Sequence, residues 1–120
     1  MAKQWSCWTN WNSSLKQALL DAQTKAVGDD TILETRERAG AKGTCSILDV
    51  YSLGKREAGV TWVLSPAELE QYFGSKTPTK KSIAAGITSF LAALGSGESC
   101  AVTAYTRGTA SAVLFAGWSR

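Results

Sequence analysis

The spacing of apolar residues changes along this chain, and each change marks a different expected element. Between residues 15 and 26, apolar side chains recur at intervals of three and four, as they do on one face of a helix. Ser14-Leu15-Lys16-Gln17 has the form of a capping box, and Gly28 suits a helix end. We therefore expect a helix from about residue 13 to about Val27, followed by a turn at Asp29-Asp30.

The segment before this helix holds three of the chain's five tryptophans at intervals of three residues, namely Trp5, Trp8 and Trp11. A helix that began as early as Lys3 would spread them over one broad side, because residues three apart on a helix are offset by about 60°. The pattern fits this early start, and it also fits a helix that begins only near Ser13, which we favour. On sequence grounds, the conformation of the tryptophan segment stays open.

A two-residue period replaces the helical one after Thr31. Residues 32–38 alternate loosely and are largely polar, which predicts an edge strand, and residues 39–43 are typical of a turn. A better-buried strand is expected over residues 44–53. A hairpin turn over residues 54–59 then leads to a third strand over residues 60–64, which is rich in β-forming residues.

The clearest local signal is Ser65-Pro66-Ala67-Glu68, which combines a capping residue, a proline suited to the first helical position and a reciprocal carboxylate. It predicts a short helix through Tyr72-Phe73 that ends at Gly74. A longer helix is expected from about Thr79 to Leu94. It has one apolar face and many small residues elsewhere, so another element can approach it closely.

The chain ends in an expected hairpin, with strands over residues 100–106 and 110–118 and a turn at Arg107-Gly108-Thr109. The last strand is apolar on both faces, which favours a central position in a sheet. The expected order of elements is therefore α-β-β-β-α-α-β-β. It predicts a single α+β domain over residues 1–120, with a mostly antiparallel five-stranded sheet and helices on one face.

Composition places the chain among globular proteins, because 44% of its 120 residues are hydrophobic, 19% are charged and the net charge is only +3. The longest apolar runs are too short for a bilayer span and no leader segment is visible, so we expect no membrane association. The three cysteines, Cys7, Cys45 and Cys100, are far apart and odd in number. That pattern favours free thiols in a reducing compartment, and hence a cytoplasmic location.

The residue types that common catalytic and metal sites need are missing or badly placed. The chain has no histidine, which is the commonest general base and metal ligand, and its separated cysteines form no zinc-binding pair. The glycine-rich stretches 40–43 and 95–97 lie in the wrong context for phosphate loops. Asp49 lies among apolar neighbours, and a hydrogen-bonded structural role is favoured for it over catalysis. We expect no enzyme activity, no cofactor and no bound metal.

Basic residues gather near the expected turns and helix starts. They are Arg36, Arg38, Lys42, Lys55, Arg56, Lys76, Lys80 and Lys81. Lys80 and Lys81 open the long helix, where cations oppose the helix dipole unless an anion such as a phosphate lies there. A solvated positive rim accounts for the same residues without any ligand. Nucleic-acid binding, to RNA in particular, is therefore kept as the alternative function.

Two resemblances concern the order of the elements. A helix, three strands and a helix opened by Lys80-Lys81-Ser82-Ile83-Ala84-Ala85 are similar to a double-stranded-RNA-binding domain, over residues 13–94 and interrupted by the helix at 65–74. That resemblance implies phosphate contacts from the lysines that open the second helix. An aromatic N-terminal helix and a strand ending Phe115-Ala116-Gly117-Trp118 resemble profilin, whose C-terminal helix has no counterpart here.

The tryptophan segment supports the leading hypothesis. Each tryptophan can bury on the order of 200 Å², so the three side chains either belong to the core or form an aromatic patch for another chain. Tryptophan is enriched at binding hot spots. We therefore expect a non-enzymatic protein-binding or assembly module, for instance a particle subunit, whose contact surface includes Trp5, Trp8 and Trp11. Its partner is another protein or, through self-association, a second copy of the chain.

Overall fold

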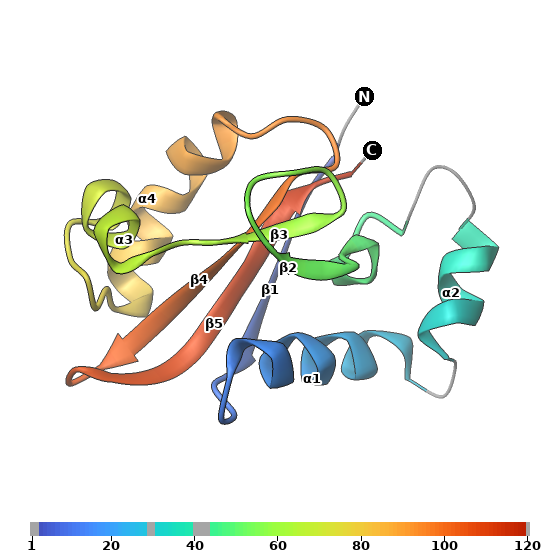
Figure 1. The fold of residues 1–120 in the computed structure, drawn as a ribbon, viewed down its shortest axis with the longest axis horizontal. Helices are drawn as coiled ribbons and strands as arrows, with labels where there is room; N and C mark the ends of the chain where they lie inside the picture. Colours follow the sequence, from blue (N-terminus) through green and yellow to red (C-terminus); the bar gives the residue numbers. More distant parts are fainter. Residues whose placement is uncertain (1–2, 29–30, 40–43, 120) are drawn as a thin grey trace.

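The fold is built on one five-stranded sheet with the strand order β1-β5-β4-β3-β2. The computed structural model describes residues 3–28, 31–39 and 44–119. The strands are β1 (Gln4–Asn10), β2 (Ser52–Gly54), β3 (Val60–Val63), β4 (Ser99–Thr106) and β5 (Thr109–Trp118). The helices are α1 (Leu15–Val27), α2 (Ile32–Ala39), the short 3-10 helix η2 (Ile47–Asp49), α3 (Pro66–Phe73) and α4 (Lys80–Ala92) (Figure 1).

The last strand lies inside the sheet, as its apolar character predicts. β5 pairs antiparallel with β1 on one side and with β4 on the other. β4 pairs with β3, and β3 with β2, in parallel. The sheet is therefore mixed, although its antiparallel ladders are by far the longer ones. The α+β class, a sheet of five strands and an interior place for β5 are confirmed, although β1 takes the place of the strand predicted over residues 32–38.

Helices cover both faces of the sheet, so the expectation of helices on one face is wrong. Val102 and Leu114 point toward α3 and α4 and join one buried cluster. Val113 and Phe115 point the other way and join a second cluster with α1 and η2. Figure 1 shows these helices on opposite sides of the sheet. The physical reason lies in β4 and β5, which are apolar on both faces and need cover on both sides.

The tryptophan segment is the strand β1, and the alternative of a helix from Lys3 is wrong. Its residues pair one for one with β5, from Gln4 opposite Trp118 to Asn10 opposite Ala112. The favoured helix start is confirmed, because the Ser14 hydroxyl accepts a hydrogen bond from the Gln17 amide at 3.1 Å. The long ladder with β5 decides the conformation, and nothing local in the segment encodes that partner.

Residues 32–38 form most of the helix α2, so the edge strand predicted there is wrong. Thr31 and Glu34 make a capping box: the Thr31 hydroxyl accepts from the Glu34 amide, and the Glu34 carboxylate accepts from the Thr31 amide, both at 3.1 Å. None of the α2 side chains is buried. The helix is held by Arg36, whose guanidinium donates to the Leu48 and Val50 carbonyls at 2.5 and 2.6 Å.

The strand predicted over residues 44–53 is reduced to β2, because a polar loop precedes it. The Asp49 carboxylate accepts from the amides of Thr44 and Cys45 and from the Thr44 hydroxyl, at 2.6–2.9 Å. These bonds favour η2 over an extended chain. They also give Asp49 the structural role expected for it. The turn predicted at 39–43 falls almost entirely on residues outside the described ranges.

The hairpin predicted over residues 54–59 is wrong, because β2 and β3 pair in parallel and a hairpin joins antiparallel strands. The turn predicted at Asp29-Asp30 lies outside the described residues. The other local predictions are confirmed. Ser65 and Glu68 form the expected capping box of α3, and Thr79 caps α4 by accepting from the Ser82 amide. β4 and β5 form the terminal hairpin, with its turn at Arg107 and Gly108 in the left-handed region. Within the described part of the chain, no helix has the length and apolar character that crossing a bilayer requires.

Candidate binding surface along strand β1

The strand geometry of β1 divides the three predicted contact tryptophans between the two faces of the sheet. Side chains alternate along a strand, so an interval of three places Trp5 and Trp8 on opposite faces. Trp5 is only 8% exposed and packs in the cluster under α1. Trp11, just beyond β1, is half-buried against the same cluster. Trp8 lies on the α4 face and is 39% exposed.

Trp8 and Trp11 nevertheless both line one open depression of about 500 Å³ at the end of β1. Its lining consists of Trp8, Thr9, Asn10, Trp11, Asn12, Asp21 and Lys25. Hydrogen bonds from Asn12 at 3.0 Å and from Gln17 at 2.8 Å hold the pKa of the Asp21 carboxyl below its ordinary value. On the α4 face of the sheet, the Lys80 ammonium lies 5.3 Å from the centre of the Trp8 ring, which is a cation–π contact.

The outer edge of β1 has a regular pattern of outward backbone groups. The Lys3 carbonyl accepts from the Ser119 amide at 2.8 Å, and the Trp11 amide donates to the Ser111 carbonyl at 3.0 Å. In an antiparallel pair such bonds involve every second residue, so the odd-numbered residues of β1 face β5. The backbone groups that point away from the sheet belong to Gln4, Ser6, Trp8 and Asn10, all of which also have exposed side chains. Among the described strands, none pairs with this edge.

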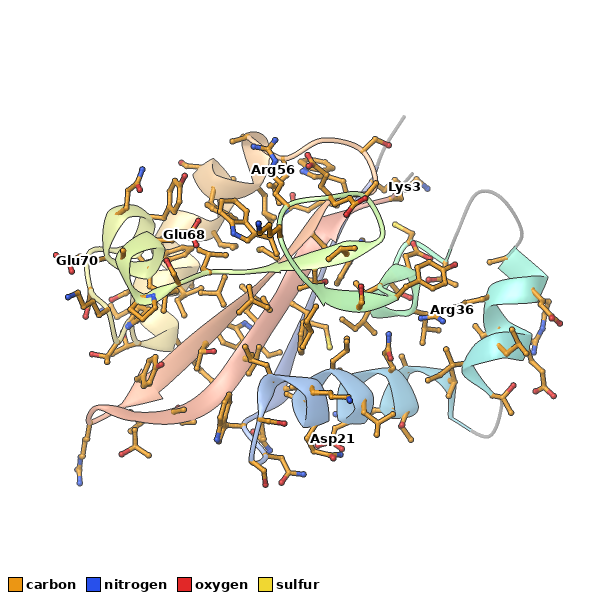
Figure 2. The ribbon with its side chains drawn as sticks, in the orientation of Figure 1. Lys3, Asp21, Arg36, Arg56, Glu68 and Glu70 are labelled. Carbon is orange, nitrogen blue, oxygen red and sulfur yellow. The ribbon has the colours of Figure 1, made fainter. Side chains whose placement is uncertain are left out.

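The basic residues predicted for nucleic-acid binding do not gather on one surface. Arg36 and Arg38 lie on α2, Lys55 and Arg56 follow β2, and Lys76, Lys80 and Lys81 lie around the start of α4. Lys42 is outside the described residues. In Figure 2, Arg36 and Arg56 lie in separate parts of the molecule, and Glu70, which is 4.0 Å from the Lys76 ammonium, lies in a third. Arg36 is committed to the backbone carbonyls beside η2.

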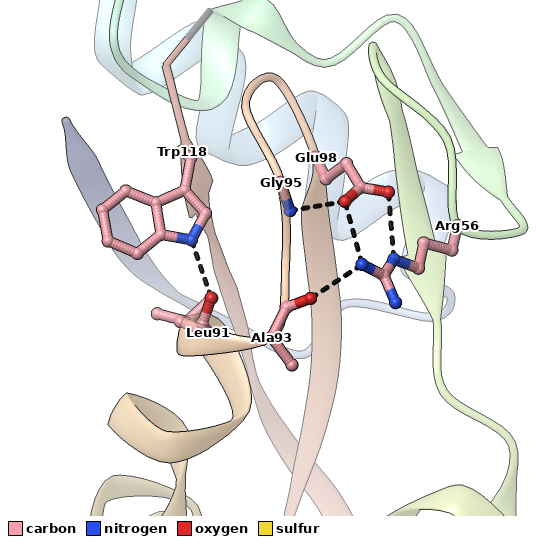
Figure 3. A network of polar contacts seen from close by, with 6 residues as sticks. All are labelled: Arg56, Leu91, Ala93, Gly95, Glu98 and Trp118. Atoms are coloured by element: carbon pink, nitrogen blue, oxygen red, sulfur yellow. Dashed lines mark hydrogen bonds and ion pairs between the residues drawn. The ribbon is translucent and has the colours of Figure 1, made fainter. Parts of the chain in front are cut away.

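Arg56 is likewise held by the fold, in the network drawn in Figure 3. Its Nε donates to Glu98 at 3.0 Å, and its Nη2 donates to Glu98 at 3.2 Å and to the Ala93 carbonyl at 2.7 Å. The Gly95 amide donates to the same carboxylate. The bonds from Arg56, and then that from Gly95, hold the pKa of Glu98 below its ordinary value. This network clamps the loop after β2 to the end of α4.

Sequence reasoning missed a small aromatic pocket beside this clamp. Trp62, Tyr72 and Phe90 contact one another with ring centres 4.8–6.2 Å apart, and they line a cavity of about 220 Å³ together with Arg56. The three rings come from β3, α3 and α4, so no local spacing relates them. The available signal was Gly86, one of the small residues of α4, where a Cβ would lie only 3.1 Å from Phe73 of α3.

Comparisons of the chain with protein-family models, with curated proteins and with solved structures find no match. The two resemblances in element order also fail on the fold itself. A strand precedes the first helix, and a helix occupies the place of the first expected strand. The candidate site is therefore interpreted from its own chemistry.

Proposed function

We propose that this chain is a non-enzymatic protein-binding or assembly module that accepts a strand of another chain at the outer edge of β1. One observation carries the proposal: β1 is a seven-residue edge strand, Gln-Trp-Ser-Cys-Trp-Thr-Asn, without a single charged residue or proline. Proteins normally protect such edges with lysine, proline, bulges or very short strands, because an open edge pairs readily with another chain.

The contrast with the opposite edge of the sheet supports this reading. β2 is only three residues long, which is one of the ordinary ways to keep an edge from pairing. β1 is more than twice as long, and its ladder with β5 runs without a register shift. An incoming strand would find outward amides and carbonyls at Gln4, Ser6, Trp8 and Asn10, and main-chain bonds of this kind supply affinity in strand addition.

The aromatic side chains would supply the side-chain contacts. Trp8 and Trp11 line the depression beside the edge, and Trp8 is the more exposed of the two. Exposed tryptophan next to an open edge suits a partner contact, since tryptophan is enriched in binding hot spots. We assign Trp5 a different role from the one expected for it: it anchors β1 to the core. The free thiols of Cys7, Cys45 and Cys100 fit a reducing compartment such as the cytoplasm.

A strand-forming peptide tests the proposal directly. The probe is acetyl-Thr-Val-Thr-Val-Thr-Val-Thr-amide, N-methylated along one edge so that it pairs with a single neighbour. We expect it to shift the NMR amide signals of Ser6, Trp8 and Asn10 and to leave those of β2 unchanged. The same peptide methylated along both edges is the negative control. Shifts that are absent, or spread evenly over the sheet, would contradict the proposal.

Substitutions at Ser6 provide matched protein controls. Its amide points outward, so Ser6→Pro removes a donor from the free edge without breaking the ladder to β5. We expect Ser6→Pro to abolish the peptide shifts and Ser6→Thr to retain them, with both variants folded by circular dichroism. Equal binding by the two variants would refute pairing at this edge.

One observation favours the second candidate, nucleic-acid binding. Lys80 lies over the exposed Trp8 ring, and Lys81 and Lys76 are exposed nearby on the chain. Lysines beside an exposed aromatic ring suit single strands, whose bases stack on such rings while cations contact the phosphates. This function predicts retention on an RNA column that falls steeply with salt. Passage through the column at low salt would exclude it.

A further inference from the structure

The outward groups of β1 restrict how two copies of this chain can pair with each other. In an antiparallel pair, outward-facing residues of one strand must meet outward-facing residues of the other. One register pairs the whole of β1 with itself: Gln4 opposite Asn10 of the second copy, and Ser6 opposite Trp8 of the second copy. Shifting the register by two residues in either direction leaves part of each strand without a β1 partner.

Side-chain sizes favour the same register. Trp8 then faces the small Ser6 on the α4 face, and Trp5 faces Thr9 on the other, which is a favourable aromatic and β-branched pair. A shift of two residues toward the C-terminus sets Trp8 against Trp8. The opposite shift leaves Thr9 and Asn10 without partners in β1. In the full register, Cys7 lies opposite Cys7 on the two-fold axis.

Charge presents no obstacle to this pairing. β1 carries no formal charge, so two copies bring no like charges together within the ladder. Two lysines act on residues of β1: Lys25 lowers the pKa of the Cys7 thiol against the larger raising effect of burial, and the Lys80 ammonium lies 5.3 Å from the centre of the Trp8 ring. The lysines of two approaching copies would repel each other weakly, and salt screens that repulsion. Added salt therefore leaves this association unchanged or strengthens it.

We infer that the strand accepted by β1 is β1 of a second copy, paired antiparallel about a two-fold axis through Cys7. This inference rests on the proposed function and names its partner. The two five-stranded sheets become one continuous sheet of ten strands, with β2 at each outer end. The contact is symmetric, as a closed dimer requires. A single strand pair is a small interface, so the dimer is expected at micromolar rather than nanomolar concentrations.

Disulfide trapping tests the axis. Facing residues at a non-hydrogen-bonded position lie about 4.5 Å apart at Cα, within the range that a disulfide spans. In the variant Cys45→Ser/Cys100→Ala, Cys7 is the remaining thiol. Oxidised glutathione then converts two Cys7 thiols into one interchain disulfide and is reduced to two molecules of glutathione. We expect a covalent dimer on non-reducing gels, formed faster with rising protein concentration and no slower at high salt.

A mixed pair of variants tests the register. In a background that also carries Cys7→Ser, Gln4→Cys and Asn10→Cys are each prepared separately. In this register Gln4 of one copy lies about 20 Å along the strand from Gln4 of the other copy, and the same holds for Asn10. We therefore expect that neither variant crosslinks alone and that the mixture gives a heterodimer. Crosslinking of Gln4→Cys alone as fast as Cys7 would mean random collision and would overturn the inference.

The peptide experiment separates failure of this inference from failure of the proposed function. The dimer is refuted if light scattering shows a monomer at a protein concentration about 100-fold above one micromolar and Cys7 also forms no crosslink. If the methylated peptide still shifts the β1 amides, strand addition stands and its partner is another protein. If those shifts are also absent, both proposals fail.

Discussion

Replacing Trp5 and Trp8 one at a time with alanine tests whether the tryptophan segment is a strand with two different faces. Trp5 is 8% exposed and Trp8 is 39% exposed, a difference of 31%. A tryptophan buries on the order of 200 Å², so this difference is about 60 Å² and, at about 25 cal/mol per Å², about 1.5 kcal/mol. Removing Trp5 also leaves a cavity. We therefore expect Trp5→Ala to cost about 4 kcal/mol and Trp8→Ala about 2 kcal/mol.

Urea unfolding followed by far-UV circular dichroism measures both losses without depending on tryptophan fluorescence. The comparison is valid where the m-value is unchanged, since the midpoint then reports the free energy of unfolding. Trp5→Phe is the control that keeps an aromatic ring in the core, and it should lose much less than Trp5→Ala. Trp8→Ala should stay folded but weaken the peptide-induced shifts at β1.

Equal losses for Trp5→Ala and Trp8→Ala would refute the reasoning. Such a result would mean that both side chains have the same environment, as they would on one broad side of a helix. A Trp5→Ala variant with nearly wild-type stability would likewise contradict the placement of Trp5 in the core.

Three further predictions concern the clamp, the centre of the sheet and the buried thiol. Because its pKa is lowered, Glu98 stabilises the folded state above the ordinary carboxyl pKa, and this stabilisation is lost as pH falls through the folded-state pKa. Glu98→Gln should therefore melt at a lower temperature than wild type at neutral pH and at the same temperature in acid. A difference in melting temperature that stays constant with pH would contradict the Arg56 pairing. Gly117→Ala places a Cβ 2.5 Å from the Ser99 Cβ, so we expect its urea midpoint to fall by an amount equivalent to about 1–3 kcal/mol, and an unchanged midpoint would be inconsistent with this packing. Burial raises the pKa of the Cys100 thiol to about 12, so a disulfide reagent should leave Cys100 unmodified in the native protein and label it after unfolding, as mass spectrometry can establish.

The predictions that used capping patterns located the starts of the helices correctly. Ser14 and Ser65 mark the starts of α1 and α3, because each hydroxyl bonds an amide within its own first turn. Thr31 and Glu34 carry the same signal for α2. The prediction for that segment rested on the loose two-residue alternation alone and did not use the cap, so it gave a strand where the chain forms a helix.

The candidate site was only partly predictable. The tryptophans were rightly singled out as unusual, but their faces depended on a conformation that the sequence left open. Trp5 and Trp8 separate because β1 pairs with β5, more than one hundred residues later in the chain. The open edge of β1 follows from the same pairing. The basic residues could be identified from the sequence. Their hydrogen bonds could not, because Arg36 and Arg56 donate to carbonyl and carboxylate groups that lie far from them in the chain.

By itself, the sequence determined the α+β class, the terminal hairpin and the central place of β5, because these follow from local caps, turns and the apolar character of single segments. Only the tertiary structure decided that β1 is a strand, that helices cover both faces, and that an uncharged edge is left open beside Trp8. Each of these depends on hydrogen bonds or packing between segments far apart in the chain. Nothing in the spacing of residues within one segment specifies which distant segment will satisfy its backbone.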